Sequence, residues 1–257
     1  MGISLKNKIV LVTGASSGIG GACAKIFAEH GANIILCARR GERIKQLVTE
    51  LVSQYSVKCH ALELDVRDRG KVAKEIGALP AAWQNIDILI NNAGLAAGMN
   101  KIQDGDIEDW EKMIDTNLKG LLYMTRAVLP GMIERNSGHV INIGSVAGHE
   151  VYPNGNVYCA TKHAVYALTK GLKMDVLGSK VRVSSVDPGM TETEFSIVRW
   201  RGDTERAKKF YAGMQPLTAL DVADTVYYCA SRPLHVNILD IIMMPVAQSA
   251  AMQVHRE

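Results

Sequence analysis

Apolar and polar residues follow a repeated pattern in which short β-branched runs alternate with longer amphipathic stretches. Several short runs are apolar without alternation, such as Ile9 to Val12 and Ile88 to Ile90, which suits strands that helices cover on both faces. The pattern predicts strands at residues 9–12, 33–38, 57–62, 86–90, 139–143, 181–186 and 238–243. It predicts helices at residues 18–30, 42–54, 70–82, 107–135, 155–177 and 221–231. We therefore expect an α/β fold with a doubly wound, parallel, seven-stranded sheet and helices on both faces.

The chain has 257 residues without an internal repeat or a Pro/Gly/Ser-rich linker, so we expect a single domain over residues 1–257. A (β/α)8 barrel has a similar length and alternation. Barrels commonly bind phosphate after late strands, whereas here a glycine-rich turn, Gly14 to Gly20, directly follows the first predicted strand. This placement favours a Rossmann-type sheet. Thr218, followed three residues later by Asp221, predicts the start of the last helix.

Composition and charge narrow the classes of function. Hydrophobic residues make up 47% of the chain and charged residues 21%, which excludes a disordered or collagen-like protein. The formal net charge of +3 is far below that of typical nucleic-acid or anionic-membrane binders, so we expect neither partner. The five cysteines form no Cys-x-x-Cys pair, which indicates a reduced, cytoplasmic chain and predicts no metal site. No signal peptide or apolar run of about 18 residues is present, so we expect a soluble protein.

The turn after the first strand has the composition of a phosphate site. Glycines allow backbone N–H groups to approach an anion closely, and the following helix N-terminus adds a partial positive charge. The spacing is G-x-x-x-G-x-G, and the bland alternative is an ordinary glycine turn. We expect pyrophosphate to contact Gly14, Ser16, Ser17, Gly18, Ile19 and Gly20.

The end of the second predicted strand indicates which coenzyme would bind. An NAD site would place an acidic residue there for the ribose 2′-hydroxyl, but this chain has Ala38, Arg39 and Arg40. Two guanidinium groups suit a 2′-phosphate, with Arg39 the first choice and Arg40 the second. The alternative is a solvated basic start to the next helix. The sequence therefore predicts NADP(H) as the cofactor, with a strong preference over NAD(H).

One helical pair has the chemistry of a proton donor and acceptor. Tyr158 and Lys162 are four residues apart and so share a helix face. An ammonium group nearby stabilises a phenolate, so we expect Lys162 to lower the pKa of Tyr158 from its ordinary value of about 10. Tyr158 would then protonate a carbonyl oxygen or accept an alcohol proton. Ser145, just past a predicted strand, offers a hydroxyl that would position the substrate oxygen.

These motifs together resemble the short-chain dehydrogenase/reductase family over the whole chain. The motifs are, in order, Thr13-Gly14-x-x-x-Gly18-x-Gly20, Asp65-Val66, Asn91-Asn92-Ala93-Gly94, Asn117, Ser145, Tyr158-x-x-x-Lys162 and Pro188-Gly189. Within the family, the segments around residues 85–95, 113–117, 124–132 and 243–249 resemble the NADP-dependent 3-hydroxy acid dehydrogenases, which oxidise serine and allo-threonine. The resemblance implies a homotetramer in which the helices at residues 107–135 and 155–177 pack against a neighbouring subunit.

The resemblance also implies roles for individual residues. Asn117 would anchor a water molecule in the proton path to Lys162, and Lys162 would hold the nicotinamide ribose. Asn91 would stabilise the sheet. The implied cofactor contacts are Asp65 and Val66 beside the adenine, Asn92, Ala93 and Gly94 along the cleft, Tyr158 and Lys162 at the nicotinamide ribose, and Pro188, Gly189 and Thr191 at the carboxamide.

Substrate specificity is expected in residues 146–155 and in a flap at about residues 190–213, because loops on a rigid scaffold usually carry such choices. Arg199 and Arg201 in the flap are candidates to pair with a substrate carboxylate, the alternative being solvated charges. His149 and Glu150 depart from the less charged pattern of the serine dehydrogenases. The moderately apolar tail, about residues 245–257, lacks turn signals and is a candidate to dock on another subunit, the alternative being a frayed end. The expected substrate contacts are Ser145, Val146, Tyr152, Tyr158 and Arg199.

The sequence thus predicts an NADP(H)-dependent oxidoreductase that interconverts a small 3-hydroxy acid and its carbonyl compound. An alternative is an NADPH-dependent reductase of small aldehydes or ketones, such as sulfoacetaldehyde. A second alternative is a sensor that binds NADPH without catalysis, which the fold alone would permit.

Overall fold

The computed structural model describes residues 2–257, and its centre is a parallel sheet of seven strands in the order β3-β2-β1-β4-β5-β6-β7. The sheet reverses its winding direction between β1 and β4, where Val10 lies opposite Ile88. This open sheet with two edges confirms the predicted doubly wound fold and excludes a closed barrel. The strands are β1 (Ile9–Thr13), β2 (Asn33–Ala38), β3 (Cys59–Glu63), β4 (Ile88–Asn91), β5 (Gly138–Ile143), β6 (Val181–Pro188) and β7 (Asp240–Met243).

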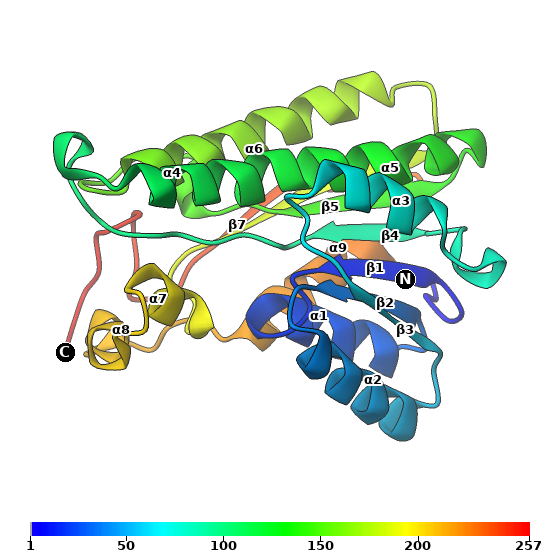
Figure 1. Ribbon diagram of the computed structural model, residues 1–257, viewed down its shortest axis with the longest axis horizontal. Coiled ribbons are helices and arrows are strands. Elements are labelled where there is room, and N and C mark those ends of the chain that lie inside the picture. The colour runs from blue at the N-terminus through cyan, green and yellow to red at the C-terminus, as the bar shows by residue number, and fades with distance from the viewer. Residues whose placement is uncertain (1) are drawn as a thin grey trace.

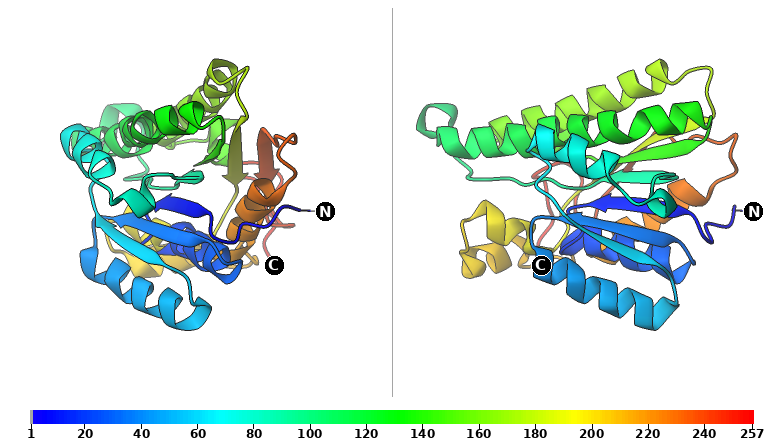
Figure 2. Two further views of the ribbon diagram at one scale, coloured as in Figure 1. Left: turned by 90° about the vertical axis from the view of Figure 1, so that its right-hand side faces the viewer. Right: turned by 45° about the vertical axis from the view of Figure 1, so that its right-hand side comes forward.

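Helices cover both faces of the sheet (Figures 1 and 2). Helices α1, α2 and α9 lie on one face, and α3 to α6 lie on the other. The helices are α1 (Gly18–Glu29), α2 (Gly41–Tyr55), α3 (Arg69–Gly77), α4 (Ile107–Ile114), α5 (Leu121–Glu134), α6 (Asn156–Asp175), α7 (Glu194–Arg199), α8 (Thr204–Tyr211) and α9 (Ala219–Ser231). Short 3₁₀ helices are η1 (Ala81–Trp83), η2 (Ile102–Asp104) and η4 (Val146–Gly148), and η3 (Asp115–Gly120) is a π-helical segment.

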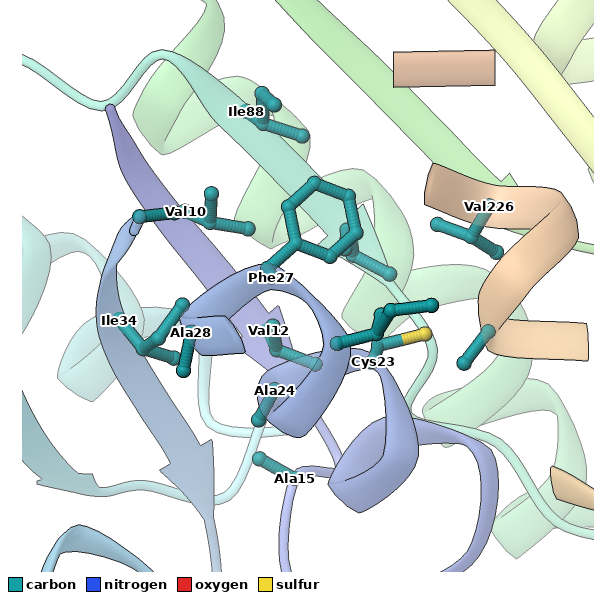
Figure 3. Close-up of a cluster of buried hydrophobic side chains, with 14 of the residues drawn as sticks. Val10, Val12, Ala15, Cys23, Ala24, Phe27, Ala28, Ile34, Ile88 and Val226 are labelled. Atoms are coloured by element: carbon teal, nitrogen blue, oxygen red, sulfur yellow. The ribbon is translucent and has the colours of Figure 1, made fainter. Parts of the chain in front are cut away.

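The apolar runs of the strands are buried because both faces of the sheet are covered. On the α1 face, Val10, Val12 and Ile34 pack against Phe27, and Val226 of α9 closes the cluster (Figure 3). All five side chains are fully buried. Loss of a buried ring such as that of Phe27 costs about 3–5 kcal/mol, so this layer fixes where β1 ends and α1 begins.

Most predicted elements are present, and their ends differ for identifiable reasons. The predicted helix at residues 107–135 is one continuous run of α4, η3 and α5, with a π-helical segment in its middle. The predicted helix at residues 70–82 ends at Gly77, shortly before Pro80, which cannot donate a helical hydrogen bond. Strand β7 begins two residues later than predicted because the Asn237 side chain takes both backbone bonds of Val183. The predicted start of α9 is confirmed, since Thr218 and Asp221 form a capping box.

The flap and the tail fold together on the same chain. The flap contains α7 and α8, which the sequence analysis left without elements. Arg256 of the tail donates hydrogen bonds to the carbonyls of Phe210 and Ala212, at the end of α8. The tail therefore contacts the flap of its own chain, and its docking on another subunit stays a prediction. No helix within residues 2–257 combines the length and apolar character needed to cross a membrane.

Candidate active site

A cleft of about 360 Å³ opens at the carboxyl ends of the strands. In doubly wound sheets, ligands bind at this edge, where the strand order reverses. The cleft collects the predicted site residues except Gly20, Asn117 and Arg201, which are not part of its lining. Those in its lining are Gly14, Ser16, Ser17, Gly18, Ile19, Arg39, Arg40, Asp65, Val66, Asn92, Ala93, Gly94, Ser145, Val146, Tyr152, Tyr158, Lys162, Pro188, Gly189, Thr191 and Arg199.

The glycine turn between β1 and α1 is built for close backbone approach. Gly14 and Gly18 have φ angles of 66° and 54°, in the left-handed region that favours glycine. A side chain on Gly20 would overlap the carbonyl of Gly14 and the amide of Asn92. The Asn92 amide is held there by a 2.9 Å hydrogen bond to the Thr13 carbonyl. Gly14 and Gly18 line the cleft at the N-terminus of α1, so their backbone N–H groups can approach a pyrophosphate closely, as a dinucleotide site requires.

The two arginines after β2 differ in their contacts. Arg40 donates to the hydroxyls of Ser16 at 3.0 Å and Ser17 at 2.6 Å, so it is tied to the glycine turn. It also pairs with the flap residue Glu194 at 2.8 Å. Arg39 lines the cleft, and its side chain donates no hydrogen bond within residues 2–257. Both arginines thus line the cleft, and the Arg39 guanidinium has its donors unengaged within residues 2–257.

Glu194 connects the flap to this basic corner, and sequence reasoning missed it. Besides Arg40, its carboxylate binds Arg43 at 2.7 Å, and these two arginines hold the pKa of Glu194 below its usual value. Thr193, just before it, packs its side chain over Gly18. The partners are some 150 residues apart in sequence, so no local signal could have paired them.

Ser145 and Tyr158 face the cleft from adjacent elements. Ser145 follows β5 and caps η4, with its hydroxyl accepting from the N–H of Ala147 at 3.1 Å and donating to the carbonyl of Pro188 at 3.4 Å. Tyr158 lies in the first turn of α6, against the ring of Phe195 in the flap. A hydrogen bond with Ser145 favours the Tyr158 phenolate. The two residues therefore line the same part of the cleft.

The pKa of Tyr158 differs from the expectation. Burial raises it well above its ordinary value, and the opposing influences come from Arg199 and Ser145 rather than from Lys162. The Lys162 ammonium lies 5.9 Å from the centre of the Tyr158 ring and donates instead to the carbonyl of Ile143 at 2.8 Å. At neutral pH Tyr158 is accordingly a neutral phenol, which is the proton-donating form.

Lys162 is 7% exposed, and burial lowers its pKa to about 8. A buried ammonium near its titration point responds strongly to neighbouring charge. The negative charge that acts on Lys162 is Asp187, which raises the pKa again.

Asn117 lies on η3, where the π-helical segment turns its side chain toward the neighbouring loop. Its amide donates to the carbonyl of Leu95 and accepts from the Leu95 N–H, both at 2.8 Å. A further bond at 3.1 Å reaches the hydroxyl of Thr161 on α6. The side chain thus fastens the loop after β4 to the helix that carries Tyr158. π-Helical segments of this kind occur frequently at functional sites.

The flap arginines separate into one inside the cleft and one outside it. Arg199 is 6% exposed, donates to the Tyr152 hydroxyl at 3.1 Å, and lies 5.1 Å from the ring centres of both Tyr158 and Phe195. Arg201 is exposed and paired with Asp106 and Asp109. Arg201 as a partner for a substrate carboxylate is therefore wrong, because two carboxylates already satisfy it away from the cleft.

Two residues that support the cleft were also missed. The Thr13 hydroxyl accepts from the N–H groups of Asn92 and Ala93, at 2.9 and 3.0 Å, and so shapes the loop after β4. Gln248 of the tail accepts from the N–H of Met190 at 2.8 Å, beside Gly189. Thr13 was visible as the polar end of an apolar strand, but its partners are on another strand.

Asn91 stabilises the sheet as predicted. Its amide donates to Asn142 at 3.0 Å and to a threonine hydroxyl on α5 at 2.9 Å.

Comparison with known proteins agrees with this geometry. A family model described as short chain dehydrogenase matches residues 8–203. The chain belongs to the short-chain dehydrogenase family. The match begins at β1 and ends between α7 and α8, so it includes the glycine turn, the Tyr158 helix and the first part of the flap.

Named relatives within the short-chain dehydrogenases are similar over nearly their full length. The NADP-dependent 3-hydroxy acid dehydrogenase YdfG of Escherichia coli strain K12 is 49% identical over 251 residues, covering 97% of this chain and 100% of its own. The serine 3-dehydrogenase of Agrobacterium fabrum is 43% identical over 249 residues, covering 96% and 98%. A solved structure, the closed form of serine dehydrogenase complexed with NADP+, superposes with a TM-score of 0.90 at 49% identity, covering 97% of this chain and 100% of that one.

Proposed function

We propose that this protein is an NADP(H)-dependent oxidoreductase that interconverts a small 3-hydroxy acid, such as serine or allo-threonine, and its carbonyl compound. Two relatives at 49% and 43% identity carry the names NADP-dependent 3-hydroxy acid dehydrogenase and serine 3-dehydrogenase, which supports both the cofactor and the reaction class. The single observation that carries the substrate class is the position of Arg199 in the cleft.

Arg199 is a buried cation with room for an anion. Its guanidinium makes one side-chain hydrogen bond, to Tyr152, and no carboxylate within residues 2–257 pairs with it. A buried cation without a counter-ion is costly, so the site gains from an anionic ligand. A carboxylate bound there would place the hydroxyl carbon of a 3-hydroxy acid, two carbons along the substrate, beside Tyr158, whose ring centre lies 5.1 Å from the Arg199 guanidinium. Tyr152, Phe195 and Tyr158 crowd this end of the cleft, which favours a short substrate.

The remaining residues then take roles in proton transfer. Tyr158 donates its phenolic proton to the carbonyl oxygen during reduction and accepts the alcohol proton during oxidation. Ser145 orients the same oxygen by hydrogen bonding. Lys162 is the adjacent buried cation, whose ammonium opposes the charge of a phenolate. Asn117 positions the helix of Tyr158 through Thr161.

The chain's own residues fit NADP(H). The glycine turn, in which Gly14 and Gly18 line the cleft with φ angles in the left-handed region, accommodates the pyrophosphate at the N-terminus of α1. Arg39 and Arg40 suit the 2′-phosphate, and Asp65 and Val66 line the cleft where the adenine would lie. When bound, the cofactor supplies or accepts the hydride.

We also propose a homotetramer in the cytoplasm. Large apolar side chains are exposed on the outer helices that the family resemblance assigns to subunit contacts, including Ile107, Leu122 and Met174. The five cysteines are unpaired thiols, as a reducing compartment favours. Size-exclusion chromatography with light scattering tests the assembly, which should have the mass of four 28.0 kDa chains. A monomer would contradict it.

The function is tested by nicotinamide absorbance with a panel of 3-hydroxy acids, the matching amino alcohols without a carboxylate, and neutral or sulfonated aldehydes. We expect turnover of the 3-hydroxy acids with NADP+. Arg199→Met should raise KM for the acids about tenfold to a hundredfold and leave the neutral substrates unchanged. Arg201→Met is the matched control and should change neither. Preferred turnover of neutral aldehydes would favour a general carbonyl reductase, and tight NADPH binding without any turnover would favour a sensor.

A further inference from the structure

A buried polar cluster lies directly behind the turn that carries Ser145. Asp187, at the end of β6, is 1% exposed, and its carboxylate lies 2.5 Å from Nε2 of His149. Ser185 on the same strand donates to the other carboxylate oxygen. Asp240, at the start of β7, completes the cluster. One ring nitrogen of His149 and one carboxylate oxygen of each aspartate all lie within 4.8 Å of one another. The cluster joins two strands to the loop after β5.

The cluster contacts both ends of the turn that carries Ser145, residues 144–149, which we call the Ser145 turn. Gly144, immediately before Ser145, packs its backbone on the Asp187 carboxylate so closely that a side chain there would overlap it. His149 immediately follows η4, the short helix that Ser145 caps. Asp187 is also followed by Pro188, whose carbonyl accepts from the Ser145 hydroxyl at 3.4 Å. One carboxylate therefore holds the residues that enter and leave this turn.

The cluster also lies next to Lys162, whose ammonium donates to the carbonyl of Ile143, the residue before Gly144. Asp187 opposes the effect of burial on this ammonium and raises its pKa. The other titratable or charged groups around the pair are Asp240 on β7 and, on α6, Tyr166, whose ring contacts His149, with Lys170 over that ring. Lys170 is exposed to solvent, so its charge is well screened. Asp187 is thus the buried anion that acts on Lys162.

An ionised aspartate at this buried position lowers the stability of the folded state. Burial raises the pKa of Asp187 to about 6, Asp240 raises it as well, and the hydrogen bonds from Ser185 and His149 oppose this. An asparagine would fill the same space, accept from Ser185 and carry no charge. A cost of this kind is typical of groups kept for function rather than stability.

We propose that Asp187, held by His149, is a positioning residue that fixes the Ser145 turn and supplies the buried counter-charge for Lys162. The inference rests on the proposed roles of Ser145 and Lys162 and adds two residues that do not touch the substrate. It also gives a purpose to His149, which departs from the serine dehydrogenase pattern.

The test compares Asp187→Asn with the wild type in the reducing direction, on whichever carbonyl substrate the wild type turns over. We expect kcat to fall about tenfold to a hundredfold, as for a misplaced hydroxyl, while the Kd of NADPH changes less than about twofold. The alkaline limb of the pH profile should move to lower pH by about one unit, because Lys162 loses the charge that supports its ammonium. The melting temperature should stay the same or rise. His149→Gln, which can still donate to Asp187, should retain more activity than His149→Ala.

Two further measurements separate positioning from folding. Titration of Lys162 by NMR of ¹³C-labelled lysine, assigned with Lys162→Met, should show the same acid shift in Asp187→Asn without relying on turnover. His163→Gln, a histidine on α6 outside the cluster, is the matched control and should behave as wild type. An unchanged pH profile and Lys162 titration in Asp187→Asn, or a loss of kcat matched by a loss of melting temperature, would overturn the inference. Failure of the proposed function would instead appear as a wild type inactive on the whole panel.

Discussion

Replacement of Lys162 by methionine should make the protein more stable and inactive. Lys162 is buried in α6 and makes one side-chain hydrogen bond within residues 2–257, to the carbonyl of Ile143. Methionine has a similar length, no branch at Cβ and a high helix propensity, so it occupies the space of the lysine side chain without carrying a charge. Turnover should be lost because the ammonium beside Tyr158 is removed.

The size and sign of the effect follow from the titration of the lysine. Burial lowers the pKa of Lys162 from 10.5 to about 8, and at 1.4 kcal/mol for each pH unit the buried charge costs about 3 kcal/mol at pH 7. The Ile143 carbonyl left unpaired in the variant returns about 1–3 kcal/mol of this. Between pH 8 and 10.5 the unfolded chain holds the proton while the folded chain has lost it, so wild-type stability rises with pH. The advantage of Lys162→Met should therefore shrink by about 1.4 kcal/mol for each pH unit above 8.

Urea unfolding of both proteins by circular dichroism, at intervals from pH 7 to about 9.5, measures this difference. The decisive quantity is the slope of this free-energy difference against pH. The unpaired Ile143 carbonyl changes the difference by the same amount at every pH and so does not affect the slope. Lys170→Met, at an exposed position on the same helix, is the control and should show a difference from wild type that is independent of pH. A difference between Lys162→Met and wild type that stayed constant over the range would refute the reasoning.

Four other substitutions test the site. Tyr158→Phe should abolish turnover and leave the Kd of NADPH, read by fluorescence, within about twofold, since it removes one hydroxyl; parallel loss of binding would indicate a folding role. Arg39→Asp should reverse the preference for NADPH over NADH in kcat/KM, and a retained preference would leave the 2′-phosphate to Arg40. Glu194→Gln removes a carboxylate beside that phosphate, so NADPH should bind a few-fold more tightly in fluorescence titration and NADH equally well; weaker NADPH binding would show that Glu194 instead holds Arg40 in place. Gly20→Ala should lower both the melting temperature and NADPH affinity, because its methyl group overlaps the Asn92 amide, and wild-type affinity would contradict the tight-turn argument.

The sequence was sufficient for the sheet and for much of the cleft wall because both depend on local signals. Unbroken apolar runs such as Ile9 to Val12 indicate strands that are buried on both faces. The glycine turn indicates where the first strand ends and the first helix begins. All parallel strands then end at one edge, so residues just past strand ends, such as Ser145, converge without any knowledge of contacts. The fold therefore brings together the predicted residues from every βα unit.

The helices and contacts of the flap and the tail escaped prediction because they depend on partners far along the chain. Glu194 is held by Arg40, and Arg256 by carbonyls at the end of α8. The same limit explains the error over Arg201, whose two aspartates lie about 90 residues earlier. Spacing can show that two arginines lie near a cleft, but only the packing of α7 decides that Arg199 points inward.

The number of hydrogen-bond partners around each buried cation distinguishes a cation that stabilises the fold from one that is a candidate for binding a ligand. Arg182 on β6 is as buried as Arg199, yet its guanidinium donates to three carbonyls, at 2.7, 3.2 and 3.3 Å, around the C-terminus of α9. Those carbonyls are the unsatisfied end of a helix dipole, so Arg182 repays its desolvation within the folded chain. Arg199 and Lys162 each have one side-chain hydrogen bond within residues 2–257 and keep donors directed at the cleft. A cation that the fold leaves incompletely bonded, in a cavity that admits small molecules, is stabilised by an anionic or hydrogen-bonding ligand in that cavity, and this supports the proposal that the reacting groups bind against Arg199 and Lys162.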